Sequence, residues 1–128
     1  GMEPELKANP KLKTTMAAQP LTYDLFVVAM GMPGFLVRSG NKYSLNQRDV
    51  DLTGDSFLPY AKEISVPTMV VQNTNDPMPN LDMVKRYHED IPGEKELLWL
   101  DLEKKREAAY DWIGKNPEAV LDWFGKYL

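Results

Sequence analysis

Two short runs of consecutive apolar residues dominate the hydrophobic pattern of the chain. The first, residues 66–72, reads VPTMVVQ, and the second, residues 96–101, reads ELLWLD. Neither run alternates apolar with polar positions, which is typical of strands in a parallel sheet that is buried on both faces. Between them, Leu81–Asp90 has apolar residues at helical spacing, and Asn80 is a suitable capping residue. The pattern predicts an α/β fold, a small parallel-sheet βαβ unit with flanking helices.

The flanking helices are predicted with unequal strength. After the βαβ unit, residues 102–114 can form a helix, and a final helix has Asn116 as its cap and Pro117 at its first position. The amino-terminal half predicts a short helix that starts at Pro10 and ends by Pro20, and a second helix from Tyr23 to Met30. It also predicts an extended surface loop from Arg38 to Thr53 and a short helix over residues 57–64. The residues expected to pack inward include Leu25, Phe26, Val28 and Ala29 in the helix from Tyr23, and Val120, Leu121, Trp123, Phe124 and Tyr127 in the final helix.

Composition excludes several classes of function. The chain has 128 residues, which suits a single domain over residues 1–128 that buries roughly two thirds of its extended surface. Its net charge of −4 and interspersed charges leave no basic footprint for a phosphate backbone, so no nucleic-acid partner is expected. Cysteine is absent and His88 is the only histidine, so we expect no disulfide, no metal site and no cofactor. The longest apolar stretch, residues 25–37, is broken by glycine and proline and is shorter than the ~20 residues that span a bilayer, so we expect a cytoplasmic protein without a membrane partner.

The text from Ile64 to Pro79 carries a more specific pattern, an apolar strand that opens with Val-Pro-Thr and ends at a turn with Asp-Pro. This pattern resembles the late strand of the α/β-hydrolase fold that presents the acid of the catalytic triad. ELLWLD resembles the last strand of that family, and NPEAVLDWFGKYL resembles its terminal helix. The resemblance covers residues 57–128 and implies a core like the carboxyl-terminal half of an α/β-hydrolase. Residues 1–56 would then form a helical or looped, cap-like region.

Asp76 matches the position of the triad acid of this family, whose role is to orient a histidine. The resemblance therefore implies that Asp76 is a catalytic candidate, either as a remnant or as the acid of a site shared with another chain. A structural interpretation is favoured over both. Asn75, Asp76 and Pro77 are good turn formers, and an aspartate can close an Asx turn on its own backbone.

The nucleophile of the family is missing. No G-x-S-x-G elbow surrounds any of the four serines, which are Ser39, Ser44, Ser56 and Ser65. The nearest text, GDSFL at residues 54–58, resembles the Gly-Asp-Ser motif of another hydrolase group, but charged residues precede it and no Asp-x-x-His follows. Asp55 or Ser56 is better explained as a helix cap.

The histidine of the family is missing as well. It should follow the last strand, where Lys104 or Lys105 stands near the position. A lysine with an ordinary pKa of about 10.4 is protonated at neutral pH. These residues are therefore expected to be solvated surface or helix-end charges, with an anion-binding edge beside the active-site rim as the alternative. His88 would lie roughly 12 Å along its helix from the turn that carries Asp76, whereas a triad contact needs about 3 Å. It is interpreted as a structural histidine.

Three functional hypotheses follow. The first is a truncated, catalytically incomplete hydrolase domain that is inactive alone and acts as an oligomerising or binding module. The second is a subunit of a hydrolase completed by another chain, with Asp76 as the triad acid. Because exposed apolar parallel strands invite pairing, we expect either a homodimer or a second chain that completes the sheet, and a small-molecule ligand is compatible with both. A third, weaker hypothesis is a cation site in the acidic loop with Asp49, Asp51 and Asp55, although its spacing is not that of an EF-hand.

Overall fold

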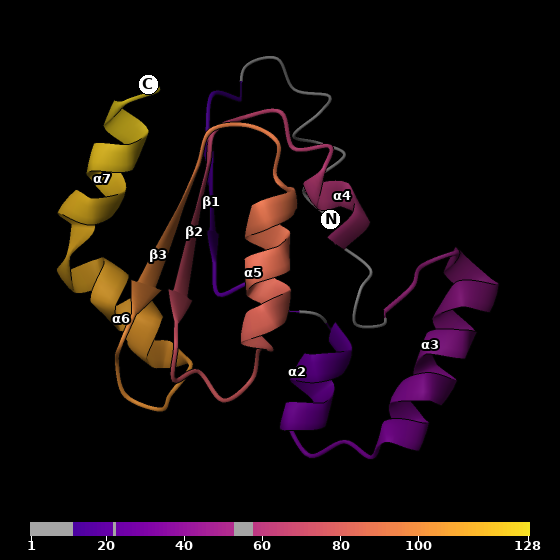
Figure 1. Ribbon diagram of the computed structural model, residues 1–128. Coiled ribbons are helices and arrows are strands. Elements are labelled where there is room, and N and C mark those ends of the chain that lie inside the picture. Colours follow the sequence, from indigo (N-terminus) through magenta and orange to yellow (C-terminus); the bar gives the residue numbers. More distant parts are fainter. Residues whose placement is uncertain (1–11, 22, 53–57) are drawn as a thin grey trace.

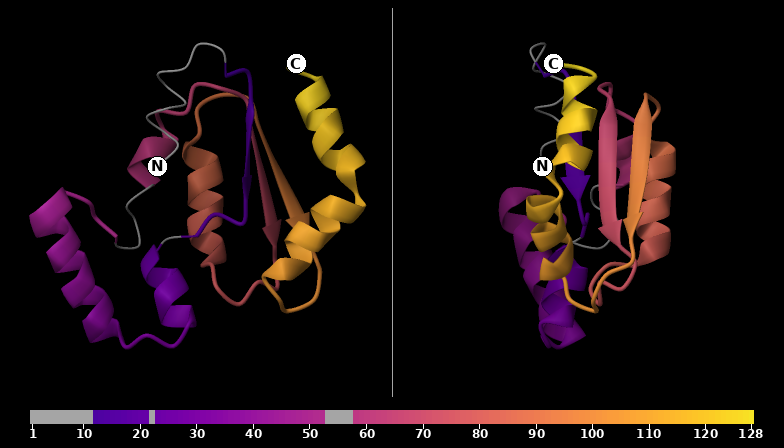
Figure 2. Two further views of the ribbon diagram at one scale, coloured as in Figure 1. Left: turned by 180° about the vertical axis from the view of Figure 1, so that it is seen from behind. Right: turned by 90° about the vertical axis from the view of Figure 1, so that its left-hand side faces the viewer.

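The computed structural model describes residues 12–21, 23–52 and 58–128, and it confirms the expected α/β fold (Figure 1). In chain order the elements are β1 (Thr15–Ala18), α2 (Tyr23–Ala29), α3 (Gly34–Arg48), α4 (Leu58–Ala61), β2 (Thr68–Asn73), α5 (Leu81–Asp90), β3 (Lys95–Leu100), α6 (Glu107–Lys115) and α7 (Pro117–Gly125). The strands form one sheet with helices on both faces (Figure 2). Among the described residues, no helix is both long enough and apolar enough to cross a membrane.

The sheet has the strand order β1-β2-β3, and both strand pairs are parallel. In this register Val70 lies beside Ala17 on one side and beside Leu97 on the other. All six residues of β2 are buried, because this strand has a neighbour at each edge and helices over each face. The continuous apolar run of β2 and the βαβ unit made by β2, α5 and β3 are thus confirmed.

Each face of the sheet has its own hydrophobic core, since successive side chains of a strand point to opposite faces. On one face Val70 packs with Ile91 among the residues of α4 and α5. On the other face Val71 packs with Trp123 among the residues of α6 and α7. The indole nitrogen of Trp123 donates a hydrogen bond of 2.9 Å to the Thr14 hydroxyl, which ties α7 to the start of β1. Two separate cores explain why β2 has no polar face.

The helix caps were predicted with mixed success. α5 begins as expected, because the side-chain oxygen of Asn80 accepts hydrogen bonds from two backbone N–H groups of the first turn. α7 begins at Pro117, but within the described residues Asn116 makes no side-chain hydrogen bond to that helix. The Asn116 amide instead donates to the Trp112 carbonyl oxygen at 2.8 Å and closes the end of α6.

The prediction of a short helix from Pro10 that ends by Pro20 is wrong in the part that the structure describes. Thr15–Ala18 form the strand β1, whose residue Thr15 is aligned with Thr68, 53 positions later in the chain. The Thr15 N–H donates to the carbonyl of Pro67 at 3.0 Å. Pairing with β2 satisfies the backbone and overrides the local helix signals, so part of the region 1–56 belongs to the sheet.

The surface loop expected from Arg38 to Thr53 is also wrong, because most of it lies in the helix α3. Turn-forming residues inside the segment are tolerated, and one of them has a structural task. Asn41 is buried, and its side-chain oxygen accepts a hydrogen bond of 2.5 Å from the Leu52 N–H. The helix ends where Asp49 adopts a left-handed conformation with φ of 53° and donates its N–H to Leu45. A long-range side-chain bond and a left-handed cap therefore define α3, neither of which periodicity reveals.

Two predicted buried faces differ from those in the structure. In α2, Phe26 and Val28 are exposed and Val27 is buried, because this helix packs against α3 rather than against the sheet. In α7, Leu121 is 64% exposed although Trp123 is buried as expected. Helix α6 begins at Glu107 instead of residue 102, since the preceding residues form a loop held at the end of β2.

Candidate functional site

The carboxyl ends of the three strands bring together segments that are far apart in the sequence. Gln19 follows β1, Asn73 ends β2, and the loop over residues 101–106 follows β3. In open parallel sheets, ligands bind at this edge. The candidate site therefore consists of the turn that carries Asp76 and the groups that converge on it.

Asp76 lies in a turn directly after β2, and its side chain is completely buried. One carboxylate oxygen, Oδ1, accepts a hydrogen bond of 3.0 Å from the Met78 N–H, which is the Asx turn expected from the sequence. The other oxygen, Oδ2, accepts a hydrogen bond of 3.0 Å from the guanidinium of Arg106. Each oxygen of this buried carboxylate is thus engaged within the chain.

Arg106 is the residue that supplies the positive charge, and it stands immediately before α6. One guanidinium nitrogen donates a hydrogen bond to Asp76. The other donates to two acceptors, the Gln19 carbonyl oxygen at 3.0 Å and the Tyr110 hydroxyl at 3.2 Å. The guanidinium also lies 5.9 Å from the centre of the Tyr110 ring. With its side chain 17% exposed, Arg106 is a fixed, partly buried cation.

Gln19 completes a reciprocal contact with Arg106. The side-chain amide of Gln19 donates a hydrogen bond of 2.6 Å to the Arg106 carbonyl oxygen, while the Gln19 carbonyl oxygen accepts from the guanidinium. Gln19 is buried and has a φ of 50°, a left-handed conformation that is rare for residues with a side chain. Its side-chain oxygen accepts no hydrogen bond from the described part of the chain. This contact joins the end of β1 to the start of α6.

Asn73 holds the loop that delivers Arg106. Its side-chain amide donates to the carbonyl oxygens of Glu103 at 2.9 Å and Lys105 at 3.2 Å. Its side-chain oxygen accepts hydrogen bonds from the backbone N–H groups of Asn75 at 3.1 Å and Leu102 at 3.2 Å. One buried asparagine therefore fixes both the turn with Asp76 and the loop before α6.

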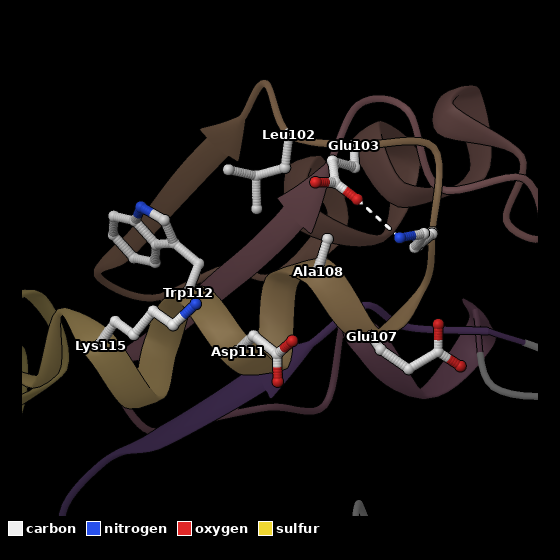
Figure 3. A pocket seen from close by; sticks show the side chains of 8 residues that line it. Leu102, Glu103, Glu107, Ala108, Asp111, Trp112 and Lys115 are labelled. Atoms are coloured by element: carbon white, nitrogen blue, oxygen red, sulfur yellow. Dashed lines mark ion pairs between the residues drawn. The ribbon is translucent and has the colours of Figure 1, made fainter.

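A hollow of about 240 Å³ lies beside this loop (Figure 3). Its lining residues are Leu102, Glu103, Lys105, Glu107, Ala108, Asp111, Trp112 and Lys115. Glu103 and Lys105 form an ion pair of 2.8 Å at its rim. The hydrogen bond and charge of Lys105 lower the pKa of Glu103, and the same contact raises the pKa of Lys105. None of these eight lining residues is a serine, cysteine or histidine, so the hollow offers no nucleophile of the serine or cysteine type.

The structure separates the other residues considered from the sequence. Lys104 and Lys105 are exposed, and it is the next residue, Arg106, that contacts Asp76. His88 lies in the last turn of α5, whereas Asp76 precedes the first turn, so the two lie toward opposite ends of that helix. Burial, followed by the charge of Lys95, lowers the pKa of His88.

Those remaining candidates that the structure describes do not assemble into a site. Ser39 and Ser44 lie within α3, and Ser65 lies between α4 and β2. Thr53, Asp55 and Ser56 lie outside the described residues. Across residues 12–21, 23–52 and 58–128, the acidic side chains and the histidine form no group of three that could hold a metal ion.

Arg106 and Gln19 are the site residues that sequence reasoning missed. The only local signal was the position of Arg106 shortly after the last strand, where the family that the sequence resembles places its histidine. Nothing local pointed to Gln19, because its contact with Arg106 spans 87 positions.

Comparison with known proteins agrees with this architecture. Neither models of known protein families nor curated proteins match the chain. Among solved structures, an esterase from Pyrococcus furiosus matches with a TM-score of 0.62 and 15% sequence identity. The chain has part of an esterase fold. The match covers 98% of this chain and 48% of the esterase, so the chain spans about half the length of that protein. At this identity the likeness shows the fold alone, and the role of Asp76 stays a prediction.

Proposed function

We propose that the chain is a catalytically incomplete, hydrolase-like domain that acts as an oligomerising or binding module. The observation that carries the proposal is the ion pair between Asp76 and Arg106. A triad acid must accept a hydrogen bond from an imidazole N–H. Here a guanidinium takes that place at 3.0 Å, and arginine stays protonated in proteins, so it cannot act as a general base.

The surroundings of the ion pair strengthen this argument. To free its carboxylate for a histidine, Asp76 would have to release Arg106, which also donates to the Gln19 carbonyl and the Tyr110 hydroxyl. Removing the cation from a buried carboxylate lowers the free energy of unfolding by about 3–5 kcal/mol. The network thus favours a structural role for Asp76, as its Asx turn does.

A hydrolase subunit completed by another chain is the second candidate function. Two observations favour it: Asp76 stands at the carboxyl end of β2, and the chain spans 48% of the esterase with a similar fold. In such a complex a partner would supply the nucleophile and the histidine, and Arg106 would have to turn away. An Asp76→Asn variant would then abolish hydrolysis by the mixed complex, at a temperature and denaturant concentration where the variant chain is still folded.

A fluorophosphonate probe for activated serines tests the proposal. The purified chain is treated with the probe, and intact and peptide masses are measured, with an active serine esterase treated in parallel as a positive control. We expect no adduct on any serine, including Ser39, Ser44 and Ser65. Stoichiometric labelling of one serine would show an activated nucleophile and overturn the proposal.

A further inference from the structure

We infer that a second copy of this chain docks on the face formed by the outer edge of β1 and by the helical hairpin, which we define as α2, α3 and the turn between them. The inference rests on the proposed function, because it names the partner of the binding module. Figure 2 shows β1 at the front of its left-hand view, with α2 and α3 to one side. The strand edge and the hairpin are thus accessible from the same side of the molecule.

The outer edge of β1 is open within the described part of the chain, where no other strand pairs with it. The N–H groups of Thr15 and Gln19 point toward β2, so those of Met16 and Ala18 point away from it, by the alternation of a strand. The sequence of β1 is TMAA, with none of the charged residues or prolines that guard exposed edges. Its outward donors are available to pair with another strand.

The hairpin exposes an unusual amount of apolar side chain. Six of the eleven residues from 26 to 36 are large, apolar and at least 40% exposed: Phe26, Val28, Met30, Met32, Phe35 and Leu36. At roughly half exposure these side chains present on the order of 500 Å² of apolar surface. Stable interfaces bury about 800 Å² on each partner, so the hairpin and the adjoining strand edge reach the required scale.

Charge favours a second copy over an unrelated chain. The hairpin contains three basic residues, Arg38, Lys42 and Arg48, and one acidic residue, Asp24. Residues 49–100 contain ten acidic and four basic residues, so this part of the same chain carries a net negative charge. Each copy therefore carries both halves of a complementary contact.

A two-fold axis accounts for the strand edge and the charges together. Two β1 strands related by such an axis pair antiparallel and join the two sheets into one of six strands. The strands of the partner therefore run in the opposite direction to those of the first copy. The hairpin lies toward the carboxyl ends of the strands, on the same side of the sheet as α5 (Figure 1). It would therefore meet the other end of the partner, where α5 finishes with Glu89 and with Asp90, which also lies 4.0 Å from Lys62 of its own chain.

Light scattering after size exclusion measures the mass directly. We expect the wild-type chain to elute at twice 14.6 kDa. Phe35→Lys, at a side chain that is 60% exposed, is expected to raise the dissociation constant at least tenfold. Leu121→Lys is the matched control, since Leu121 is 64% exposed on α7, away from the hairpin, and it should remain dimeric. Circular dichroism confirms that both variants are folded.

A second pair of variants tests the strand edge and the charges. Ala18→Pro removes an outward N–H, and we expect it to give a monomer. Arg38→Glu should weaken the dimer, most strongly at low salt. A wild-type mass of 14.6 kDa at every concentration would overturn the inference, as would an equal dissociation constant for Phe35→Lys and Leu121→Lys. A monomer that associates only with a different polypeptide would overturn it too.

The two proposals fail in distinguishable ways. Labelling of a serine by the fluorophosphonate probe would refute the incomplete-hydrolase proposal, whatever the mass of the protein. A monomeric, unlabelled chain would refute the second copy and leave the incomplete-hydrolase proposal in place.

Discussion

Replacing Arg106 by methionine provides the most direct test of the network around Asp76. Methionine keeps much of the length of the side chain and removes its charge. The Asp76 side chain is completely buried, so it would lose its cation without gaining access to water. The hydrogen bonds to the Gln19 carbonyl and the Tyr110 hydroxyl would be lost at the same time.

The size of the effect follows from the burial of the two partners. Removing one partner of a buried ion pair costs about 3–5 kcal/mol, and the 17% exposure of Arg106 places this pair toward the lower end. We expect Arg106→Met to lower the free energy of unfolding by about 3 kcal/mol. Asp76→Asn should cost less, about 1–2 kcal/mol, because the Asx turn survives and Arg106 can reach water.

Urea unfolding, followed by tryptophan fluorescence at one fixed chain concentration, measures these differences. The fixed concentration matters because association stabilises the folded state. Lys105→Met is the matched control, since it removes the neighbouring cation from an exposed ion pair with Glu103, and it should leave the midpoint unchanged. The reasoning is refuted if Arg106→Met behaves like Lys105→Met, or if Asp76→Asn destabilises the protein more than Arg106→Met does.

Three further predictions concern other buried groups. The pKa of His88 is lowered, so the folded state binds fewer protons than the unfolded state, and stability should fall as the pH drops below 6.5. Melting curves of His88→Gln should show a weaker dependence of stability on pH, and an unchanged dependence would contradict this prediction. Burial raises the pKa of Tyr127 to about 12, so between pH 10 and 12 the unfolded state loses the phenolic proton while the folded state keeps it. Stability should therefore fall over this pH range, and it should fall less in Tyr127→Phe. Asn73→Ala should lower the free energy of unfolding by about 2–4 kcal/mol, because the side chain makes four partly buried hydrogen bonds to backbone groups. The exposed Asn75→Ala should cost less than about 1 kcal/mol in the same urea measurement, and similar losses for the two variants would speak against the role given to Asn73.

The core of the fold could be predicted because its signals are local. The apolar run of β2 is continuous, and such a run is stable only where both faces are covered. Asn80 stands directly before an apolar helical pattern, and its side chain caps α5 as expected. The Asx turn at Asp76 is local as well, since it joins residues only two positions apart. For α5 and for the Asx turn, the deciding contact lies within a few residues of the pattern that predicts it.

The amino-terminal elements could not be predicted for the opposite reason. β1 has four residues with no alternation, and it is a strand because β2 lies beside it. α3 contains turn formers and lacks a clear apolar face, yet it is a helix whose Asn41 holds the backbone of Leu52. Local propensity contributes less than about 1 kcal/mol per residue, so such long-range bonds override it.

The candidate site, too, has one part that the sequence predicts and one part that it does not. The sequence by itself determined that Asp76 follows a buried parallel strand, that a turn holds it there, and that no serine elbow or suitably placed histidine accompanies it. Only the tertiary structure decided what the carboxylate contacts. Arg106 lies 30 positions from Asp76, and Gln19 lies 87 positions from Arg106. These groups meet because three parallel strands end at one edge of the sheet, and a buried carboxylate must take the cation that this edge brings to it.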